Sequence, residues 1–474
     1  MAKIIDGRRG GKILVHEGYI YQKNKMTSNL IYWRCASKDC RAPLKTGTFD
    51  IAAPPNDINV FDVRPHNHNS SNEVVSQQLV VNEIKDCIRE DPSTPLRRIY
   101  NRSVVSILRR DDPPTAEEIP VFHRVRSQLK RTKKRNTPPI PHRIEDVVID
   151  DVWRQTWEGV NHVNHQDNGW GIVVFASQEN LRFLGRHGRT IFVDGTFRTC
   201  PRPYNQVLTI HTLVRGHVVH LITCLMANAN IGSYRQVIQA IKNKILELRR
   251  SSWRPTTIIS DFEQASMAAF QTEFPGIQVK GCYFHFNQAL WRAIERYGLV
   301  TPYRNSQRLK KCVKKVMALG FLPLAVVQIN FNRLWQSRST RRAIRRYPAL
   351  NEFFNYIQNN YIHGNFLPSI WNVFSRTMEI RTNNHVESYH RVWNEAVGVR
   401  HPSIWSFIRV LKDHQKLNEV TIQSIRNGDE APIRRRKWRR LEQRINEKKS
   451  QYNSGEINID QYWRAITHLI LNIE

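Results

Sequence analysis

The spacing of apolar and polar residues divides the chain into a β-rich start, a mixed middle and a helical end. Residues 10–70 contain short β-rich runs separated by turn residues, at 19–21, 30–33 and 60–63. Residues 74–117 change to helical spacing that Pro92 interrupts, and Ser93 or Thr94 offers an N-cap for the helix that follows. The pattern therefore predicts a small β-rich module followed by two or three short helices.

Strands and helices alternate along residues 150–285. Apolar runs predict strands at residues 190–193, 206–214, 217–226, 256–260 and 277–283. Helical periodicity predicts helices over residues 234–248 and 262–274. Three hairpin-like strands followed by helix, strand, helix and strand are typical of a mixed α/β sheet. From residue 286 to about 425 the pattern is mostly helical.

Composition narrows the classes of protein that fit. Of the 474 residues, 40% are hydrophobic, which is enough to build folded cores and excludes wholesale disorder. No apolar run reaches the roughly 18 residues of a membrane span, and the first ten residues lack the apolar segment of a secretion signal. We therefore expect neither a membrane protein nor a secreted one.

Net charge is the strongest global signal. Lysines and arginines number 72 against 41 aspartates and glutamates, so the formal net charge is +31. A soluble chain this basic most often binds a polyanion, and nucleic acid is the usual one. The alternatives are charge that only maintains solubility and attraction to a membrane surface. Aromatic residues interleaved with the basic runs favour nucleic acid.

Two cysteines and two histidines near the N-terminus have the spacing of a metal site. The seven cysteines are odd in number and irregularly spaced, which argues against a disulfide framework. Cys35-x4-Cys40 and His66-x-His68 supply two thiolates and two imidazoles, a ligand set that suits tetrahedral structural Zn2+. Zinc would also supply folding free energy to a module of about 60 residues with a small core. The alternative is a coincidence of two surface cysteines with two loop histidines.

This module resembles a FLYWCH zinc finger. The residues that carry the resemblance are Tyr32-Trp33-Arg34-Cys35, Cys40, Lys45 and His66-x-His68. The resemblance covers residues 8–70, although the leading Phe of the family is aliphatic here. It implies a small antiparallel sheet that binds DNA. The basic residues that we expect to face phosphate groups are Arg34, Lys38, Arg41 and Lys45.

Two aspartates follow apolar strands of the central region. Asp194 comes after residues 191–193, and Asp261 comes after residues 257–260. A buried carboxylate is costly unless it is paired or binds a metal, and two aspartates at strand ends can converge on one hard cation. Each aspartate also has a structural alternative, because Asp194 can begin a turn with Gly195 and Asp261 can N-cap a helix.

A third candidate acid, Glu387, lies about 126 residues further along the chain. On a helix, it would share one face with polar residues three or four positions away. These residues are Asn383 or Asn384 and His390 or Arg391. The alternative for this string is a network of surface polar groups.

Together the three acids resemble those of the Mutator-like element (MULE) transposase domain. The matching residues, in the family's order, are Val193-Asp194-Gly195-Thr196-Phe197, Ser260-Asp261, Cys282-x-x-His285 and Asn383-Asn384-x-x-Glu387. The resemblance spans about residues 188–397. It implies an RNase H-like fold whose DDE triad, Asp194, Asp261 and Glu387, holds Mg2+ or Mn2+. The long gap before Glu387 suggests a helical insertion, and we expect Asn384 and His390 to support the active site.

The same resemblance gives Cys282 and His285 a supporting role near the active site, either structural or in positioning DNA. The alternative is a buried cysteine and a histidine satisfied by hydrogen bonds. A zinc site here would need further ligands, and Cys312 and His363 are distant in the sequence, so we do not expect zinc at this place.

Basic runs supply further candidates for DNA contact. One run, suited to a nuclear localisation signal, a DNA-backbone contact or both, consists of Lys130, Arg131, Lys133, Lys134 and Arg135. A second forms a helical stripe of Arg341, Arg342, Arg345 and Arg346. Residues 434–440 combine basic residues with Trp438. For each run the alternative is a solvated charged face.

We therefore predict an α/β protein with an RNase H-like catalytic core and a helical insertion, preceded by a small β-rich zinc-binding module and a short helical region. The predicted segments are a FLYWCH-type finger at 8–72, a helical DNA-binding or dimerisation region with a basic linker at 73–143, the first part of the core at 150–285, the insertion at 286–378, C-terminal core helices at 379–425 and a basic tail at 426–474.

The predicted function is cut-and-paste transposition in the nucleus. A homodimer or higher oligomer would bind terminal inverted repeats and target sites in double-stranded DNA, then cleave and join the strands. The main alternative is a domesticated, catalytically silent transposase that serves as a DNA-binding regulator. A third interpretation is an RNase H-like nuclease acting on RNA or hybrids, which the zinc finger disfavours.

Overall fold

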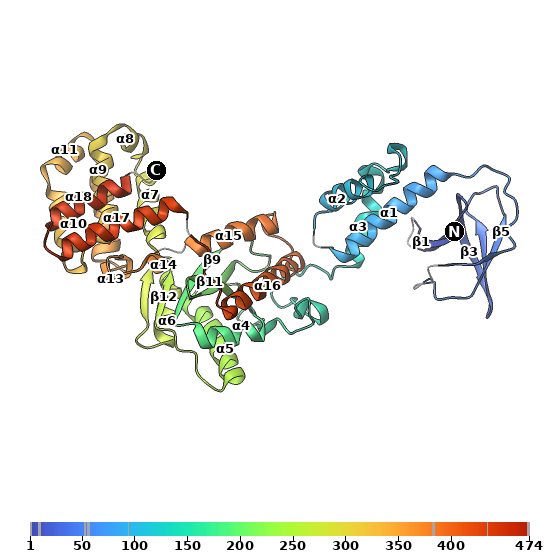
Figure 1. Cartoon of the computed structure of the whole chain (residues 1–474), viewed down its shortest axis with the longest axis horizontal. Helices are drawn as coiled ribbons and strands as arrows, with labels where there is room; N and C mark the ends of the chain where they lie inside the picture. The colour runs from blue at the N-terminus through green and yellow to red at the C-terminus, as the bar shows by residue number, and fades with distance from the viewer. Residues whose placement is uncertain are drawn as a thin grey trace. The chain divides into compact units, whose positions relative to one another are not determined.

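The computed structural model divides into two compact units, Met1–Ile140 and Pro141–Glu474 (Figure 1). It describes residues 2–7, 11–51, 54, 57–92, 94–381, 384–433 and 435–471, without the side chains of residues 384, 385 and 471. Ser93, Asn383 and Arg434, which the sequence singled out, lie outside the described residues.

A six-stranded antiparallel sheet begins the first unit. Its strands follow one another in chain order: β1 (Lys3–Asp6), β2 (Lys12–His16), β3 (Tyr19–Met26), β4 (Leu30–Cys35), β5 (Pro43–Gly47) and β6 (Val60–Phe61). The turn between β2 and β3 holds Glu17 and Gly18 at positive φ (47° and 78°), a geometry that favours glycine. Alternating side chains, including Tyr21, Trp33 and Leu44, bury a small core. The predicted β-rich module is confirmed.

Three α-helices follow among the described residues of the first unit: α1 (Asn72–Glu90), α2 (Leu96–Leu108) and α3 (Phe122–Arg135). Their apolar faces meet in a core that includes Ile84, Ile88, Ile99 and Leu129. The N-cap of α2 is Pro95, not Thr94, whose backbone N–H and hydroxyl both donate to the Asp91 carboxylate.

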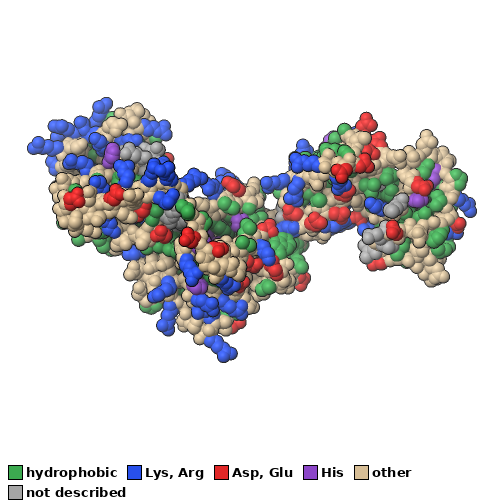
Figure 2. All heavy atoms as spheres, viewed as in Figure 1, with side chains coloured by type: hydrophobic (Ala, Val, Ile, Leu, Met, Phe, Trp, Pro, Cys, Tyr) green, Lys and Arg blue, Asp and Glu red, His purple; other side chains and the backbone are tan. Residues whose placement is uncertain are grey.

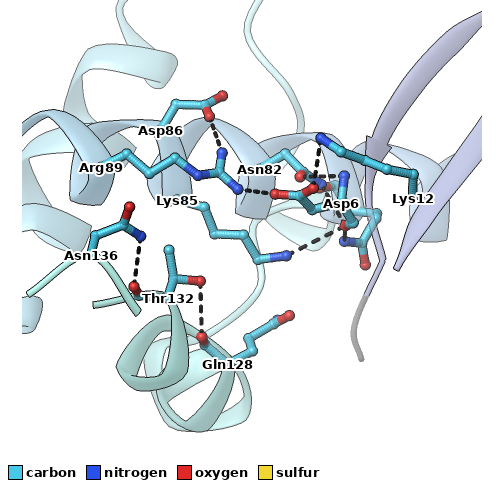
Figure 3. Close-up of polar contacts among 10 residues, drawn as sticks. Asp6, Lys12, Asn82, Lys85, Asp86, Arg89, Gln128, Thr132 and Asn136 are labelled. Atoms are coloured by element: carbon cyan, nitrogen blue, oxygen red, sulfur yellow. Dashed lines mark hydrogen bonds and ion pairs between the residues drawn. The ribbon is translucent and has the colours of Figure 1, made fainter. Parts of the chain in front are cut away.

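Polar contacts around Asp6 join the sheet to α1 (Figure 3). The Asn82 side-chain oxygen accepts a hydrogen bond of 2.8 Å from the Asp6 backbone N–H. Lys12, at 3.0 Å, and Arg89 form ion pairs with the Asp6 carboxylate. Lys85 is buried next to the Asp6 carbonyl, and burial lowers the pKa of Lys85 to about 8. The sheet and the helices are therefore held together by buried polar contacts as well as by apolar packing.

A seven-stranded mixed sheet forms the centre of the second unit. Its strands are β7 (Val163–Asp167), β8 (Ile172–Phe175), β9 (Thr190–Thr196), β10 (Gln206–Val214), β11 (His217–Met226), β12 (Thr257–Ser260) and β13 (Gln278–Gly281), in the spatial order β13-β12-β9-β10-β11-β8-β7. Strand β12 is parallel to both β9 and β13, and the other neighbours are antiparallel. The predicted mixed sheet is confirmed, with β10 and β11 at their predicted bounds.

Helices cover both faces of this sheet (Figure 1). On one face, Ile172 and Val174 pack with the helices α4 (Gln178–His187), α5 (Ile231–Arg249) and α6 (Gln264–Glu273). On the other face, Val173 and Phe175 pack with α15 (Asn384–Val397) and the first half of α16 (Ile404–Asn427). Successive residues of β8 thus serve opposite cores, as the pleat of a strand requires. Helix α6 starts at Gln264, two residues later than predicted.

A second, helical core follows the sheet in the same unit. Its elements are α7 (Tyr283–Arg296), α8 (Val300–Asn305), α9 (Gln307–Ala318), α10 (Val327–Gln336), α11 (Arg338–Arg346), α12 (Ala349–Ile357), α13 (Pro368–Trp371), α14 (Met378–Arg381), α17 (Arg436–Asn453) and α18 (Ile459–Leu471). Trp371 is fully buried at its centre and stacks on Phe286, with ring centroids 4.5 Å apart. Ile445 and Trp463 join this core, so the predicted basic tail contributes packed helices. Among the described helices, none is both long enough and apolar enough to cross a lipid bilayer.

Candidate metal centres

Four side chains of the first unit converge on one point. Cys35 ends β4, Cys40 lies in the following turn, and His66 and His68 follow β6. Their ligand atoms all lie within 4.8 Å of one another. The Cys35 Sγ is 3.3 Å from Nε2 of His68, and the Cys40 Sγ is 3.3 Å from Nδ1 of His66. The cluster that the sequence predicted is therefore assembled, and its donor set fits structural zinc.

Neighbouring groups orient both imidazole rings toward the thiols. His68 donates a hydrogen bond from Nδ1 to the Asn69 carbonyl (2.8 Å), which leaves the Nε2 lone pair facing Cys35. Nε2 of His66 is hydrogen bonded to the Tyr21 hydroxyl (2.7 Å), so its Nδ1 faces Cys40. Tyr19 stacks on the His66 ring at 3.6 Å. Supports of this kind fix the tautomer and orientation of metal-binding histidines.

The predicted DNA-contact residues of the first unit differ in exposure. Arg34, Lys38 and Arg41 are exposed around the zinc cluster, whereas Lys45 is partly buried and pairs with Asp62 at 2.5 Å. On α3 the exposed members of the basic run are Lys130, Arg131, Lys134 and Arg135. Lys133 is partly buried and donates to the Thr94 carbonyl (2.8 Å), so it contributes to packing inside the unit.

The second unit brings the two candidate aspartates onto adjacent parallel strands. Asp194 lies within β9, and Asp261 follows directly after β12, where Ser260 is paired with Val193. Asp194 is only 7% exposed. Parallel neighbours end at the same edge of the sheet, so the two carboxylates share that edge.

The third acid reaches this edge from a helix. Glu387 lies in the first turn of α15, and His390 follows one turn later. Nε2 of His390 is 2.9 Å from Oδ2 of Asp194, a short polar contact in a buried setting. Asp194, Glu387 and His390 line an open groove of about 570 Å³, together with Arg198 and Arg391. Asn384 begins α15, but its side chain lies outside the described residues.

Burial and repulsion raise the pKa values of Asp261 and Glu387. Burial, with the neighbouring Asp194 and then Glu263, raises the pKa of Asp261 to about 7. Burial, followed by the charge of Asp194, raises the pKa of Glu387 to about 7 as well. Asp194 is therefore close enough to both other acids to disfavour their ionisation. A divalent cation would relieve this repulsion, and carboxylate oxygens are the ligands that Mg2+ and Mn2+ prefer.

The three acids nonetheless do not form one tight ligand cluster among the described residues, because Glu387 lies against Cys282 and His285 instead. Cys282 is the N-cap of α7 and His285 lies in its first turn; Nε2 of His285 is 3.9 Å from Oε1 of Glu387. Cys312 and His363 do not join this group, since they contact Thr340 and Gln328 instead.

A polar network beside Asp261 has no counterpart in the sequence prediction. The Tyr234 hydroxyl is hydrogen bonded to Oε1 of Glu263 (2.6 Å) and to the side-chain oxygen of Gln206 (2.9 Å). Gly195 lies against Gln206, since a Cβ at Gly195 would stand 2.4 Å from its Nε2. The only signal for this network in the sequence is a second acid, Glu263, two positions after Asp261.

Comparison with known families finds a match in each of the two units. Residues 190–289 match the model of the MULE transposase domain, and residues 4–68 match that of the FLYWCH zinc finger domain. The chain thus combines an N-terminal FLYWCH zinc finger with a MULE transposase domain, as its motifs predict, and this pair of domains indicates a transposase-related DNA-binding protein. Asp194, Asp261, Cys282 and His285 lie inside the MULE match, whereas Glu387 lies beyond it. Among curated proteins no match was found.

Proposed function

We propose that the protein is a DNA transposase that binds terminal inverted repeats and catalyses metal-dependent DNA cleavage and strand transfer. The observation that carries this proposal is the meeting of Asp194 and Asp261 at one sheet edge, inside a MULE domain, with Glu387 on the groove beside them. We further propose that the mixed sheet is an RNase H-like core interrupted by the helical segment 286–378. The antiparallel β9-β10-β11 followed by parallel β12 and β13 supports this assignment.

In this proposal Asp194, Asp261 and Glu387 hold Mg2+ or Mn2+, and the bound cation supplies activation of water and stabilisation of the leaving oxygen. His390 is a positioning residue, because its contact with Oδ2 of Asp194 restrains the carboxylate rotamer. The groove between β9 and α15 is open, which suits a substrate as bulky as a DNA backbone. Its arginines, Arg198 and Arg391, are available to neutralise phosphate charge.

The first unit has the features of the end-recognition module. The finger exposes Arg34, Lys38 and Arg41, and α3 exposes a basic face, on one compact body. We propose that these surfaces bind terminal repeats in the nucleus. We also propose a homodimer or higher oligomer on DNA, because cut-and-paste transposition joins two ends of the element.

The test is a cleavage assay with the full chain, Mg2+ and DNA that carries the terminal repeats of the source element. Cleavage at the repeat ends should be lost in Asp194→Asn, Asp261→Asn and Glu387→Gln. It should persist in the control Glu247→Gln, an exposed carboxylate of α5 whose Oε1 is 2.7 Å from Lys244.

Repeat-specific binding by the wild type without cleavage would reject the enzyme and leave the domesticated regulator. Preferential cleavage of RNA or hybrids would favour a ribonuclease instead.

A further inference from the structure

A second cluster of metal-ligating side chains lies beside the proposed catalytic acids. Among the described residues, the ligand atoms of Cys282, His285 and Glu387 all lie within 4.8 Å of one another, the same criterion that the zinc finger meets. Cys282 and His285 are three positions apart at the start of α7, so they share one side of the helix end. Glu387 comes from the first turn of α15. Two distant segments of the chain thus converge on one point.

The cluster is largely withdrawn from solvent, and two of its polar atoms lack partners. Cys282 is 0% exposed. Nδ1 of His285 and Oε1 of Glu387 are buried and have no hydrogen-bond partner within the described part of the chain. The 3.9 Å between Nε2 of His285 and Oε1 of Glu387 is too long for a hydrogen bond. Buried polar atoms are nearly always satisfied by protein, water or an ion, so the unpartnered Oε1 of Glu387 points to a missing ligand.

The chemistry of the three donors selects the kind of ligand. A thiolate, an imidazole and a carboxylate together suit Zn2+, whereas Mg2+ and Mn2+ prefer oxygen ligands alone. The buried guanidinium of Arg376 lies close enough to Cys282 for an electrostatic interaction.

We propose that Cys282, His285 and Glu387 form a second zinc site, with three protein ligands and one position left open. Glu387 belongs both to this site and to the proposed DDE centre, so one carboxylate is shared between a soft cation and a hard one. A consequence that rests on the proposed function is competition: zinc at this site holds Glu387 away from Asp194 and Asp261, and excess zinc inhibits Mg2+-dependent cleavage.

The primary test counts zinc in the purified full chain by mass spectrometry after zinc loading and dialysis against zinc-free buffer. The wild type should retain two zinc ions per chain, one in the finger and one at the second site. Cys282→Ser and His285→Ala should each retain one. The matched control Cys312→Ser changes another buried cysteine of the same unit, which contacts Thr340, and should retain two.

One zinc ion in the wild type, or two in both site variants, would overturn the second site. If Cys282→Ser or His285→Ala fails to fold, cobalt substitution of a third variant replaces the zinc count. Co2+ bound to a thiolate gives a charge-transfer band that reports each occupied site. In the full chain, Glu387→Gln should reduce this absorption to that of the finger alone, while Asp261→Asn should leave it unchanged.

The zinc count is independent of catalysis. Two zinc ions in a protein that cleaves no DNA would keep the second site and reject the proposed enzyme. Cleavage by a protein with a single zinc ion would keep the proposed enzyme and reject the second zinc site.

Discussion

A basic stretch of the helical part of the second unit provides the sharpest test of DNA binding. Residues 296–351 contain no aspartate or glutamate. Their basic residues are Arg296, Arg304, Arg308, Lys310, Lys311, Lys314, Lys315, Arg333, Arg338, Arg341, Arg342, Arg345 and Arg346. Figure 2 shows Lys and Arg side chains gathered over the part of the molecule that carries α8, α9 and α11. We expect this surface to lie along the phosphate backbone of DNA.

The perturbation is the simultaneous change of Arg341, Arg342, Arg345 and Arg346 to Ala. All four side chains are exposed on α11, and none of them forms an ion pair with a described residue. Each lost phosphate contact reduces the slope of log K against log salt by about 0.9, so four contacts correspond to about 3.6. Between roughly 50 and 200 mM salt, wild-type affinity should then fall about 150-fold more than that of the variant.

The control removes four charges that already have carboxylate partners. Its substitutions to Ala affect Arg235 (3.0 Å from Glu273), Lys244 (2.7 Å from Glu247), Lys416 (2.5 Å from Glu158) and Arg426 (2.5 Å from Glu179). Both variants lower the net charge by four, from +31 to +27, so they weaken the long-range field alike. Fluorescence anisotropy on duplex DNA measures the slopes. Equal slopes for the two variants would refute the contact surface and leave the arginines as a solvated charged face.

Three further predictions concern stability. Chelation of zinc, or Cys40→Ser, should unfold the N-terminal sheet, because metal binding supplies much of the folding free energy of a small finger; far-ultraviolet circular dichroism would detect the loss, and an unchanged spectrum would contradict it. Asn82→Ala should lower the unfolding free energy of the first unit by about 0.5–1.5 kcal/mol in urea titrations, since the part-buried hydrogen bond from the Asp6 N–H is lost. Asn101→Ala on the exposed face of α2 should change it by less than about 0.5 kcal/mol. The pKa of Asp261 is raised to about 7, so the folded state favours the protonated carboxyl. The contribution of this carboxyl to stability is complete below its ordinary pKa of about 4 and is lost as the pH rises through 7. Without divalent cations, the melting temperature between pH 5 and 8 should therefore fall more steeply for the wild type than for Asp261→Asn. Parallel curves would show that ionisation of Asp261 does not destabilise the fold.

The elements that the sequence predicts well are those with a local signal. Strands β10 and β11 alternate or run apolar for nine or ten residues, and their bounds follow from the pattern. The bounds of strand β8 do not follow from the pattern, because its four residues are all buried between two cores and show no alternation. Strand β7 is a mostly polar edge strand, and such a strand has no apolar run to reveal it. Helix α17 has one buried apolar residue, Ile445, within a strongly basic segment, so the sequence pattern does not indicate that it packs on a core.

The candidate sites divide along the same line. The zinc ligands lie in one short module, so their spacing alone places them in a single cluster. Asp194 and Asp261 can be paired from sequence, because each follows an apolar run of residues, although β9 continues past Asp194 to Thr196. Glu387 cannot be placed in this way, since a helical core of about a hundred residues separates it from Asp261 and only tertiary packing decides which neighbours it meets. That packing sets Glu387 against His285 and Cys282 as well as within reach of the Asp194 charge. One carboxylate thus faces two different donor sets, and under the two proposals the identity of the cation would decide which of them it joins.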